Sequence, residues 1–334
     1  MERFARIIGI GSYVPEKVLT NDDLSRMVGE DINEFVSQVV GIHERHIAAE
    51  NESTVDLATE AGLRALTAAD IRPEDLDLIL LATDTPEYIS PATSVVVQHR
   101  LGASRAGTFD INCACAGFVT ALDAASKYII ADPSYTNILV IGAYAMSKYV
   151  DWTEKKTATL FADGAGAVVV QASTEGPGFL TSKLRADGHY HNYLGILAGG
   201  TFMPITEDVL REGKYTKVRF IQKYPPEINI EGWPVIVKEV LKKAGLTLDS
   251  VNLFLFTQVN LSAIKEVMQR LELPMERTHT IMGKWGYTGS ACIPMALDDG
   301  VKAGKLKPGD VLVMCASGGG LNMACAALQW TVDS

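Results

Sequence analysis

The sequence is poor in aromatic residues and cysteines and has no excess of basic charge. Phe, Trp and Tyr make up 7% of the 334 residues, and the five cysteines show no metal-ligand spacing. Acidic residues outnumber basic ones by 40 to 30, so nucleic-acid binding is not expected. No secretory pattern opens the chain, and no window of about 18 uninterrupted apolar residues predicts a membrane span. These absences predict a cytoplasmic protein with reduced thiols and no metal ion.

What the chain has instead is an internal duplication. Two apolar runs about 175 residues apart match, Leu76–Leu81 (LDLILL) and Val251–Phe256 (VNLFLF), and Ala121–Asp123 repeats as Ala296–Asp298 at the same separation. The apolar runs are short and continuous, as in strands buried on both faces, and segments with helical spacing lie between them. Alternating strands and helices predict parallel βαβ units, and hence an α/β protein.

The duplication predicts two halves, residues 1–172 and 173–334, packed as pseudo-twofold partners. The stretch 173–230 is the least repeated part, and we expect it to form excursions over a site. In each half a segment rich in Ala and Gly passes from a strand into a buried helix. The N-termini of these two helices are expected to meet near the pseudo-axis.

Cys115 is the candidate nucleophile because it stands where a buried strand passes into a helix. Free N–H groups and the helix dipole at such a position favour the thiolate, which predicts a lowered pKa for Cys115. The same N–H groups can hold the oxyanion of a tetrahedral intermediate. The alternative is a small buried core cysteine, which is the preferred interpretation of Cys113. The glycine run 318–320 would let a backbone approach the site closely.

These residues resemble the β-ketoacyl-acyl-carrier-protein synthase III family of the thiolase superfamily. Five collinear segments carry the main resemblance, at Gly41–Ala48, Cys115–Phe118, Phe161–Ala167, Gln258–Asn260 and Gly318–Gly320. The resemblance implies a thiolase fold, a five-layered αβαβα sandwich built from two pseudo-twofold halves. It also implies that Cys115 is the nucleophile and that the N–H groups of Cys115 and Gly319 form the oxyanion hole.

The sequence departs from the family at two catalytic positions. Thr257 stands where the family has a His, and Tyr287 stands where it has an Asn. In the family these two residues stabilise the enolate formed when a malonyl thioester loses carbon dioxide. Thr and Tyr can donate hydrogen bonds, but neither is a good base at neutral pH. The two replacements therefore disfavour ordinary malonyl elongation, and Thr257 and Tyr287 would orient the acceptor. Condensation with a malonyl or other β-keto-type acceptor stays open as an alternative, because the acceptor could decarboxylate elsewhere or be already activated.

The resemblance implies an acyl donor in the form of a coenzyme A or acyl-carrier-protein thioester, with no further cofactor. It also implies a homodimer in which a loop near Ser90 closes the acyl pocket of the neighbour. At the donor site Phe35 replaces a Trp that stacks on adenine, Lys155 partly replaces an Arg, and Trp233 replaces an Asn. Asn260, in the Gln-x-Asn segment, is the remaining substrate-binding candidate.

Two hypotheses follow from these residues. The first is an acyltransferase that loads Cys115 and passes the acyl group to a carbon, oxygen or nitrogen acceptor. The second is a non-catalytic partner subunit of a heteromer, which the replaced His and Asn favour and the intact segment around Cys115 disfavours. His189 and His191 offer two metal ligands or a base, but without a third ligand nearby a solvent-side loop is preferred.

Overall fold

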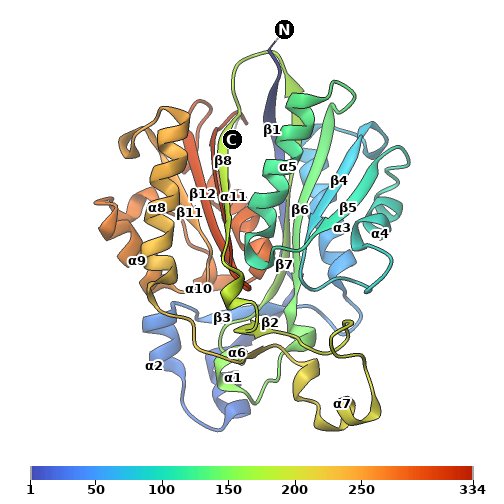
Figure 1. Cartoon of the computed structure of the whole chain (residues 1–334), viewed down its shortest axis with the longest axis vertical. Helices are drawn as coiled ribbons and strands as arrows, with labels where there is room; N and C mark the ends of the chain where they lie inside the picture. Colours follow the sequence, from blue (N-terminus) through green and yellow to red (C-terminus); the bar gives the residue numbers. More distant parts are fainter. Residues whose placement is uncertain (1, 333–334) are drawn as a thin grey trace.

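Two β-sheets lie side by side with helices on both sides of each and between them (Figure 1). The computed structural model describes residues 2–332 of the chain. The first sheet has the order β1-β7-β6-β4-β5. Its strands are β1 (Phe4–Tyr13), β4 (Leu78–Ala82), β5 (Gly107–Ile111), β6 (Asn137–Ala145) and β7 (Asp163–Ser173).

The second sheet repeats the pattern of the first. Its order is β11-β12-β13-β8, with β8 (Phe179–Ala186), β11 (Leu253–Phe256), β12 (Val311–Gly318) and β13 (Asn322–Gln329). In both sheets a parallel pair (β4 with β6, β11 with β12) is followed by two antiparallel neighbours. The apolar runs that revealed the duplication are the equivalent strands β4 and β11, and both are fully buried.

The helices complete five layers, as predicted. One outer layer holds α3 (Thr54–Ala69) and α4 (Thr93–Leu101), which pack on the first sheet, and the other holds α8 (Glu227–Ala244) and α9 (Leu261–Arg270), of which α8 packs on the second sheet. Between the sheets lie α5 (Gly117–Ala131) and α11 (Cys292–Lys302), each in contact with strands of both sheets. Gly142 permits this close packing, because a Cβ there would lie 2.4 Å from the carbonyl oxygen of Ser290.

The segment Ala114–Ala131 is apolar and long enough to pass a test for a membrane-crossing helix, and 61% of it is buried inside the protein. It includes α5, which packs between the two sheets. Its apolar composition is therefore accounted for by its place in the core.

The shorter elements gather at one end of the sheets, the lower end in Figure 1. They are α1 (Asn21–Val28), α2 (Asn33–Phe35), α6 (Lys155–Ala158), α7 (Glu207–Glu212), α10 (Met282–Trp285), β2 (Lys17–Thr20), β3 (Glu44–Ile47), β9 (Leu194–Gly195) and β10 (Arg219–Phe220). The excursion expected over 173–230 is only partly correct, because residues 179–186 form strand β8. Residues 187–226 do lie outside the two large sheets, and Tyr190, Tyr193 and Tyr224 cluster there beside Gly320.

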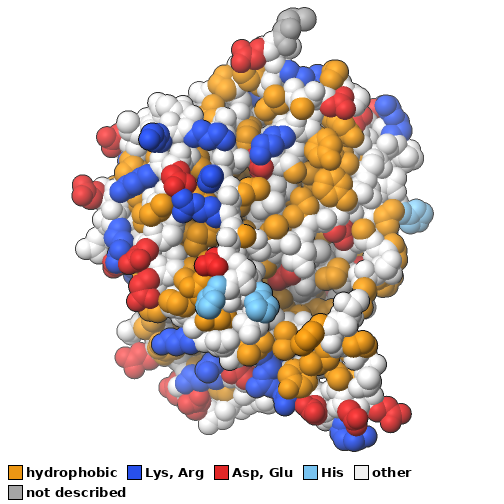
Figure 2. Space-filling model, viewed as in Figure 1, with side chains coloured by type: hydrophobic (Ala, Val, Ile, Leu, Met, Phe, Trp, Pro, Cys, Tyr) orange, Lys and Arg blue, Asp and Glu red, His pale blue; other side chains and the backbone are white. Residues whose placement is uncertain are grey.

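Strand β8 forms one edge of the second sheet, and its exposed charges suit that place. Lys and Arg side chains gather over β8 and α8 on the face shown in Figure 2. Lys183 and Arg185 are exposed on the strand, and Arg185 forms an ion pair with Glu239 of α8. Charged side chains on an edge strand hinder pairing with another chain.

Candidate active site

Cys115 lies in a tight turn at the carboxyl end of β5. A 3₁₀ turn (η3, Ala114–Ala116) follows the strand and leads directly into α5. Ala114 has φ +46°, a left-handed conformation that is uncommon for a residue with a Cβ, and such outliers cluster at functional sites. Cys115 is a buried residue, with 7% of its surface exposed.

The glycine run lies directly against this turn. A Cβ at Gly318 would lie 2.3 Å from the Cys113 carbonyl oxygen and 2.8 Å from the Cys115 amide nitrogen, so the last residue of β12 must be Gly here. Among residues 2–332 the amide groups of Cys115 and Gly319 have no backbone acceptor. N–H groups without a backbone acceptor at such a turn suit the stabilisation of an oxyanion.

Tyr287 reaches Cys115 from the other half of the chain. Its backbone is fixed by two hydrogen bonds, from its own N–H to the Leu160 carbonyl (3.0 Å) and from the Ala162 N–H to its carbonyl (2.9 Å). Its ring stacks on Phe161, with 5.9 Å between the ring centroids. From this position the Tyr287 hydroxyl forms a hydrogen bond with the Cys115 sulfur. Tyr287 precedes the 3₁₀ turn Gly289–Ala291 (η9), which contacts η3. The two helix starts therefore meet, as the duplication predicted.

The expectation of a lowered Cys115 pKa is wrong for the unliganded protein. Burial is the largest influence and raises the pKa of this thiol well above its ordinary value, and the negative charge of Asp84 raises it further. The hydrogen bond from Tyr287 acts in the opposite direction. The physical reason is that the turn is enclosed by two sheets, so the thiolate loses more hydration than the helix start alone would suggest.

Thr257 is buried and has both its donor and its acceptor engaged. It follows β11, and its hydroxyl accepts a hydrogen bond from the Ser317 N–H (2.9 Å) and donates to the Ser317 carbonyl (3.4 Å). Ser317 in turn donates to the Asn229 side chain at 2.7 Å. Thr257 therefore holds the strand end that leads to Gly319, and in this conformation it presents no free hydroxyl to a ligand.

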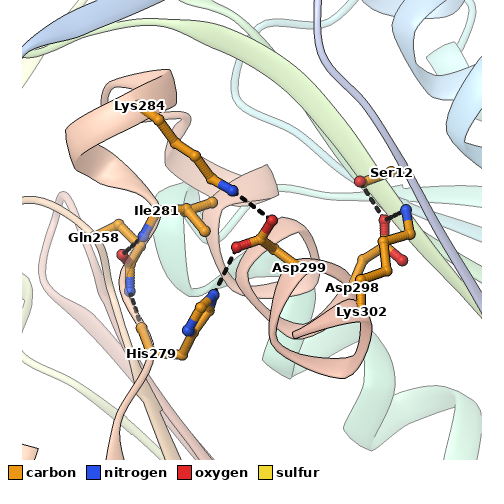
Figure 3. A network of polar contacts seen from close by, with 8 residues as sticks. All are labelled: Ser12, Gln258, His279, Ile281, Lys284, Asp298, Asp299 and Lys302. Carbon is orange, nitrogen blue, oxygen red and sulfur yellow. Dashed lines mark hydrogen bonds and ion pairs between the residues drawn. The ribbon is translucent and has the colours of Figure 1, made fainter. Parts of the chain in front are cut away.

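Gln258, the next residue, supports the same region (Figure 3). Its side-chain amide donates to the His279 carbonyl (3.3 Å), and its carbonyl oxygen accepts the Ile281 N–H (2.9 Å). The His279 ring and Lys284 both contact the Asp299 carboxylate on α11. This network fixes the loop that leads through α10 to Tyr287.

The candidates for substrate binding differ in their exposure and in the contacts of their side chains. Phe35 is 56% exposed, and Ser90 is also exposed, beside the 84% exposed Ile89. Lys155 pairs with Glu30 (2.9 Å), and the Asn260 side chain caps α9 by accepting the Ala263 N–H (3.2 Å). A hydrogen bond joins the two segments that carry Phe35 and Asn260, because the Ser262 hydroxyl donates to the Val39 carbonyl at 2.7 Å. These four residues remain candidates for substrate binding.

Trp233 does not fit the substrate-binding role predicted for it. The side chain is fully buried and stacks on Phe256, with 5.2 Å between ring centroids. No part of it can contact a ligand in this conformation. The large ring packs between α8 and the second sheet. No local sequence pattern indicated this packing.

Two groups of residues near Cys115 were missed from the sequence. The half-buried Asp84 and the buried Tyr144 are close enough to influence each other electrostatically, and a polar residue just beyond a buried strand was a usable signal for the first. Tyr190, Tyr193 and Tyr224 form an aromatic cluster over the glycine run, where the Tyr224 hydroxyl accepts the Gly320 N–H (3.3 Å). Among the described residues no group of three His, Cys, Asp or Glu side chains could hold a metal ion. His189 instead packs its ring against Tyr190.

Comparison with known proteins gives one consistent answer. Residues 109–188 match the family model described as 3-oxoacyl-[acyl-carrier-protein (ACP)] synthase III, and residues 241–330 match the model of its C-terminal part. A β-ketoacyl-[acyl-carrier-protein] synthase III from Caldanaerobacter subterraneus subsp. tengcongensis is 38% identical, and the match covers 98% of each chain.

Solved structures agree with the sequence comparisons. The crystal structure of 3-oxoacyl-[acyl-carrier-protein] synthase III from Aquifex aeolicus VF5 has a TM-score of 0.87 at 36% identity, covering 98% of this chain and 100% of that one. The priming β-ketosynthase of the R1128 polyketide pathway has a TM-score of 0.89 at 29% identity, covering 99% and 97%. These likenesses confirm the predicted thiolase fold.

Proposed function

This chain belongs to the 3-oxoacyl-[acyl-carrier-protein] synthase III family, and from that premise we propose that it is an acyltransferase that carries its acyl group on Cys115. The observation that carries the proposal is the packing of the glycine run against the turn that holds Cys115, where the N–H groups of Cys115 and Gly319 have no backbone acceptor among the described residues. Fatty-acid or polyketide biosynthesis is the setting of its relatives.

In the first half-reaction the Cys115 sulfur attacks the thioester carbonyl of acyl-coenzyme A or an acyl carrier protein. The carbonyl oxygen becomes an oxyanion, which the N–H groups of Cys115 and Gly319 would stabilise. Collapse of the intermediate breaks the bond to the donor sulfur, which leaves as a thiolate and takes up the proton lost by Cys115. Tyr287 assists by donating its hydrogen bond to the attacking sulfur. No further cofactor is needed.

For the donor, Phe35 offers an exposed ring for stacking on adenine, and Lys155 offers a cation for the phosphates. Lys155 would exchange its ion pair with Glu30 for the ligand, and exposed pairs of this kind are weak enough to exchange. A homodimer is proposed because Ile89 and Ser90 are exposed on the loop between β4 and α4. We place the protein in the cytoplasm.

The second half-reaction is proposed to differ from malonyl condensation. Thr257 has no free hydroxyl to stabilise an enolate, because both of its hydrogen bonds go to Ser317. Tyr287 is the remaining polar side chain at the sulfur, and it suits the orientation of an atypical carbon, oxygen or nitrogen acceptor. A Thr257→His, Tyr287→Asn double variant is expected to gain malonyl-dependent condensation. An unchanged rate would show that these two positions do not carry the difference.

The experiment for the proposed function is intact-mass measurement after mixing the protein with a panel of acyl-coenzyme A and acyl-carrier-protein thioesters. An added acyl mass is expected on the wild-type protein and on Cys113→Ala, the matched control, and not on Cys115→Ala. A second candidate, a non-catalytic partner subunit, is favoured by the engaged Thr257 hydroxyl. No adduct with any donor, together with co-purification of a homologue, would replace the acyltransferase by that alternative.

A further inference from the structure

Asp84 lies at the same edge of the first sheet as Cys115. Along β4, Leu78, Leu80 and Ala82 face the central core cluster, whereas the residues between them face α3. A Cβ on Gly117, at the start of α5, would lie 3.0 Å from the Ala82 Cβ. Asp84 lies two residues beyond Ala82, in the bend that follows β4 at the end of the sheet that carries the start of α5.

The neighbouring strands bring Cys115 and Tyr144 to this carboxylate. Ala82 pairs with Gly142 of β6 and with Ile111 of β5, and the Thr83 N–H continues the ladder to the Ile111 carbonyl at 3.1 Å. Two residues further along, Asp84 is level with Tyr144 and with the turn that holds Cys115. The charge of Asp84 raises the pKa of both the Cys115 thiol and the Tyr144 phenol, after the larger effect of burial.

Among the described residues Asp84 is the one aspartate or glutamate with a carboxylate oxygen that is both buried and without a hydrogen-bond partner. Asp123 is bonded to Lys127 and Ser182, Asp163 to Ala48 and Ser147, and Asp298 to Ser12 and Lys302. The Oδ1 atom of Asp84 is buried and has no hydrogen-bond donor among the described residues. A buried carboxylate oxygen left without a donor is destabilising.

Asp84 keeps partial contact with solvent. The residue as a whole is only half-buried, so water can touch part of it although Oδ1 is covered. Cys113, which follows the neighbouring strand β5, is also half-buried, and 7% of the surface of Cys115 is exposed. An acyl group attached to the Cys115 sulfur would lie at the edge of the first sheet that also carries this carboxylate.

We propose that Asp84 is a specificity-determining residue that binds a hydrogen-bond donor, a hydroxyl or an ammonium, carried by the acyl group on Cys115. The proposal rests on the proposed function, because it concerns the acyl group of that same site. A purely apolar acyl group would cover Asp84 and leave Oδ1 unpaired, whereas a donor on the chain would supply the missing bond. Sites that hydrogen-bond a substrate group reject the analogue that lacks it.

A role for Asp84 as the base that deprotonates Cys115 fits the structure less well. The hydrogen bond recorded at the sulfur comes from Tyr287, and a carboxylate without contact to the sulfur disfavours the thiolate by charge repulsion. In the binding role the negative charge of Asp84 is favourable, because it attracts a hydroxyl or ammonium group on the acyl chain.

The test uses three coenzyme A thioesters of equal length, butyryl, 3-hydroxypropionyl and β-alanyl, which differ only in a terminal methyl, hydroxyl or ammonium group. The rate of Cys115 acylation is measured by intact mass. Wild-type protein is expected to react at least about ten-fold faster with the hydroxyl or the ammonium thioester than with butyryl. Whichever of the two is faster identifies the donor chemistry.

Two variants assign the preference to Asp84. Asp84→Leu is expected to reverse the order in favour of butyryl, and Asp84→Asn to keep a hydroxyl preference while losing an ammonium preference. Glu87→Gln is the matched control, because Glu87 lies on the same loop but accepts a hydrogen bond from the Val55 N–H of α3. Glu87→Gln should leave the order of the three acylation rates unchanged. If Asp84→Leu does not fold, Asp84→Asn still tests the proposal through the ratio of the acylation rates with the polar thioesters to the rate with butyryl.

Three outcomes would overturn the proposal. One is a wild-type protein that accepts butyryl at least as fast as both polar thioesters. Another is an Asp84 variant that changes all three rates by the same factor. The third is a variant that weakens dimer formation while the order of donors stays the same, which would assign Asp84 to the subunit interface. Failure of the proposed function is distinct, since it would show as no acylation of Cys115 by any thioester.

Discussion

Hydrogen bonding by the Tyr287 hydroxyl favours the thiolate of Cys115 and acts to lower its pKa, although the two residues come from opposite halves of the chain. The bond exists because η3 and η9, the two pseudo-equivalent helix starts, contact each other at the centre of the molecule. The duplication thus supplies a nucleophile from one half and its hydrogen-bond donor from the other. Neither half alone would contain both groups.

Tyr287→Phe should slow the reaction of Cys115 with iodoacetamide by about ten-fold or more at neutral pH. The change removes a donor to the thiolate, and a hydrogen bond to a charged group is worth about 1.5–3 kcal/mol, or one to two pKa units. The rate of alkylation is followed by mass spectrometry in a Cys113→Ala background, because Cys113 is partly exposed.

Tyr144→Phe is the control for this substitution. Its phenol is buried near the same sulfur, but the structure gives it no hydrogen bond to Cys115. Its loss should leave the alkylation rate within about two-fold of the parent. Equal slowing in both variants would contradict the special role of the Tyr287 hydroxyl and point to a general loosening of the core.

Gly318→Ala should destabilise the protein by at least about 2 kcal/mol, because the new methyl group would overlap the Cys113 carbonyl at 2.3 Å. Gly319→Ala is the matched variant one residue on. The nearest atoms to a Cβ there lie 3.9 Å away, so its stability should stay within about 1 kcal/mol of the parent. Urea unfolding of both variants measures the difference. Similar losses at both positions would show that the turn is not packed as described.

The arrangement of strands and layers was predictable because it depends on local pattern. Strands β4 and β11 are buried on both faces, so they appear as unbroken apolar runs, and their repetition along the chain revealed the two-sheet architecture. Cys115 was also accessible to prediction, since its place between a strand and a buried helix is visible in the sequence. What these features share is that each is determined by residues close together in the chain.

The errors concern contacts between distant segments. The burial of Trp233 against Phe256, the hydrogen bonds between Thr257 and Ser317, and the raised pKa of Cys115 all depend on how separate strands and helices pack. No periodicity or motif reports the enclosure of a side chain by two sheets. Asp84 was overlooked for a related reason, because its lack of a partner is a property of its surroundings and not of its neighbours in sequence.

Thr257→Val should lower the free energy of unfolding by about 1–3 kcal/mol, since it removes the acceptor of the Ser317 N–H and leaves a buried donor unsatisfied. Thr257→Ser keeps the hydroxyl and should cost about 1 kcal/mol or less for the lost methyl group. Denaturant unfolding of the pair separates the hydrogen bond from packing. If the Val variant were as stable as the Ser variant, the hydroxyl would not be holding β12, and Thr257 would be free to act on a ligand.

Asp84→Asn should change the pH dependence of stability in a defined direction. Burial raises the pKa of Asp84 from 3.8 to about 6, so the folded protein binds its proton more tightly than the unfolded chain. The stabilisation from this group is complete below about pH 4 and is lost as the pH rises through 6. The wild-type protein should therefore lose about 1–3 kcal/mol relative to Asp84→Asn between pH 4 and pH 7, as measured by urea unfolding.

Asp23→Asn provides a control of opposite sign for Asp84→Asn. Hydrogen bonds from Thr20 lower the pKa of Asp23, so its carboxylate stabilises the fold above the ordinary pKa of an aspartate and loses that effect as the pH falls. Relative to Asp23→Asn, the wild-type protein should gain stability as the pH rises. If the difference between wild-type and Asp84→Asn instead stayed constant from pH 4 to pH 8, the Asp84 carboxylate would titrate normally. A group of the chain or water would then already satisfy it, and the reason for an acyl group to bind there would be lost.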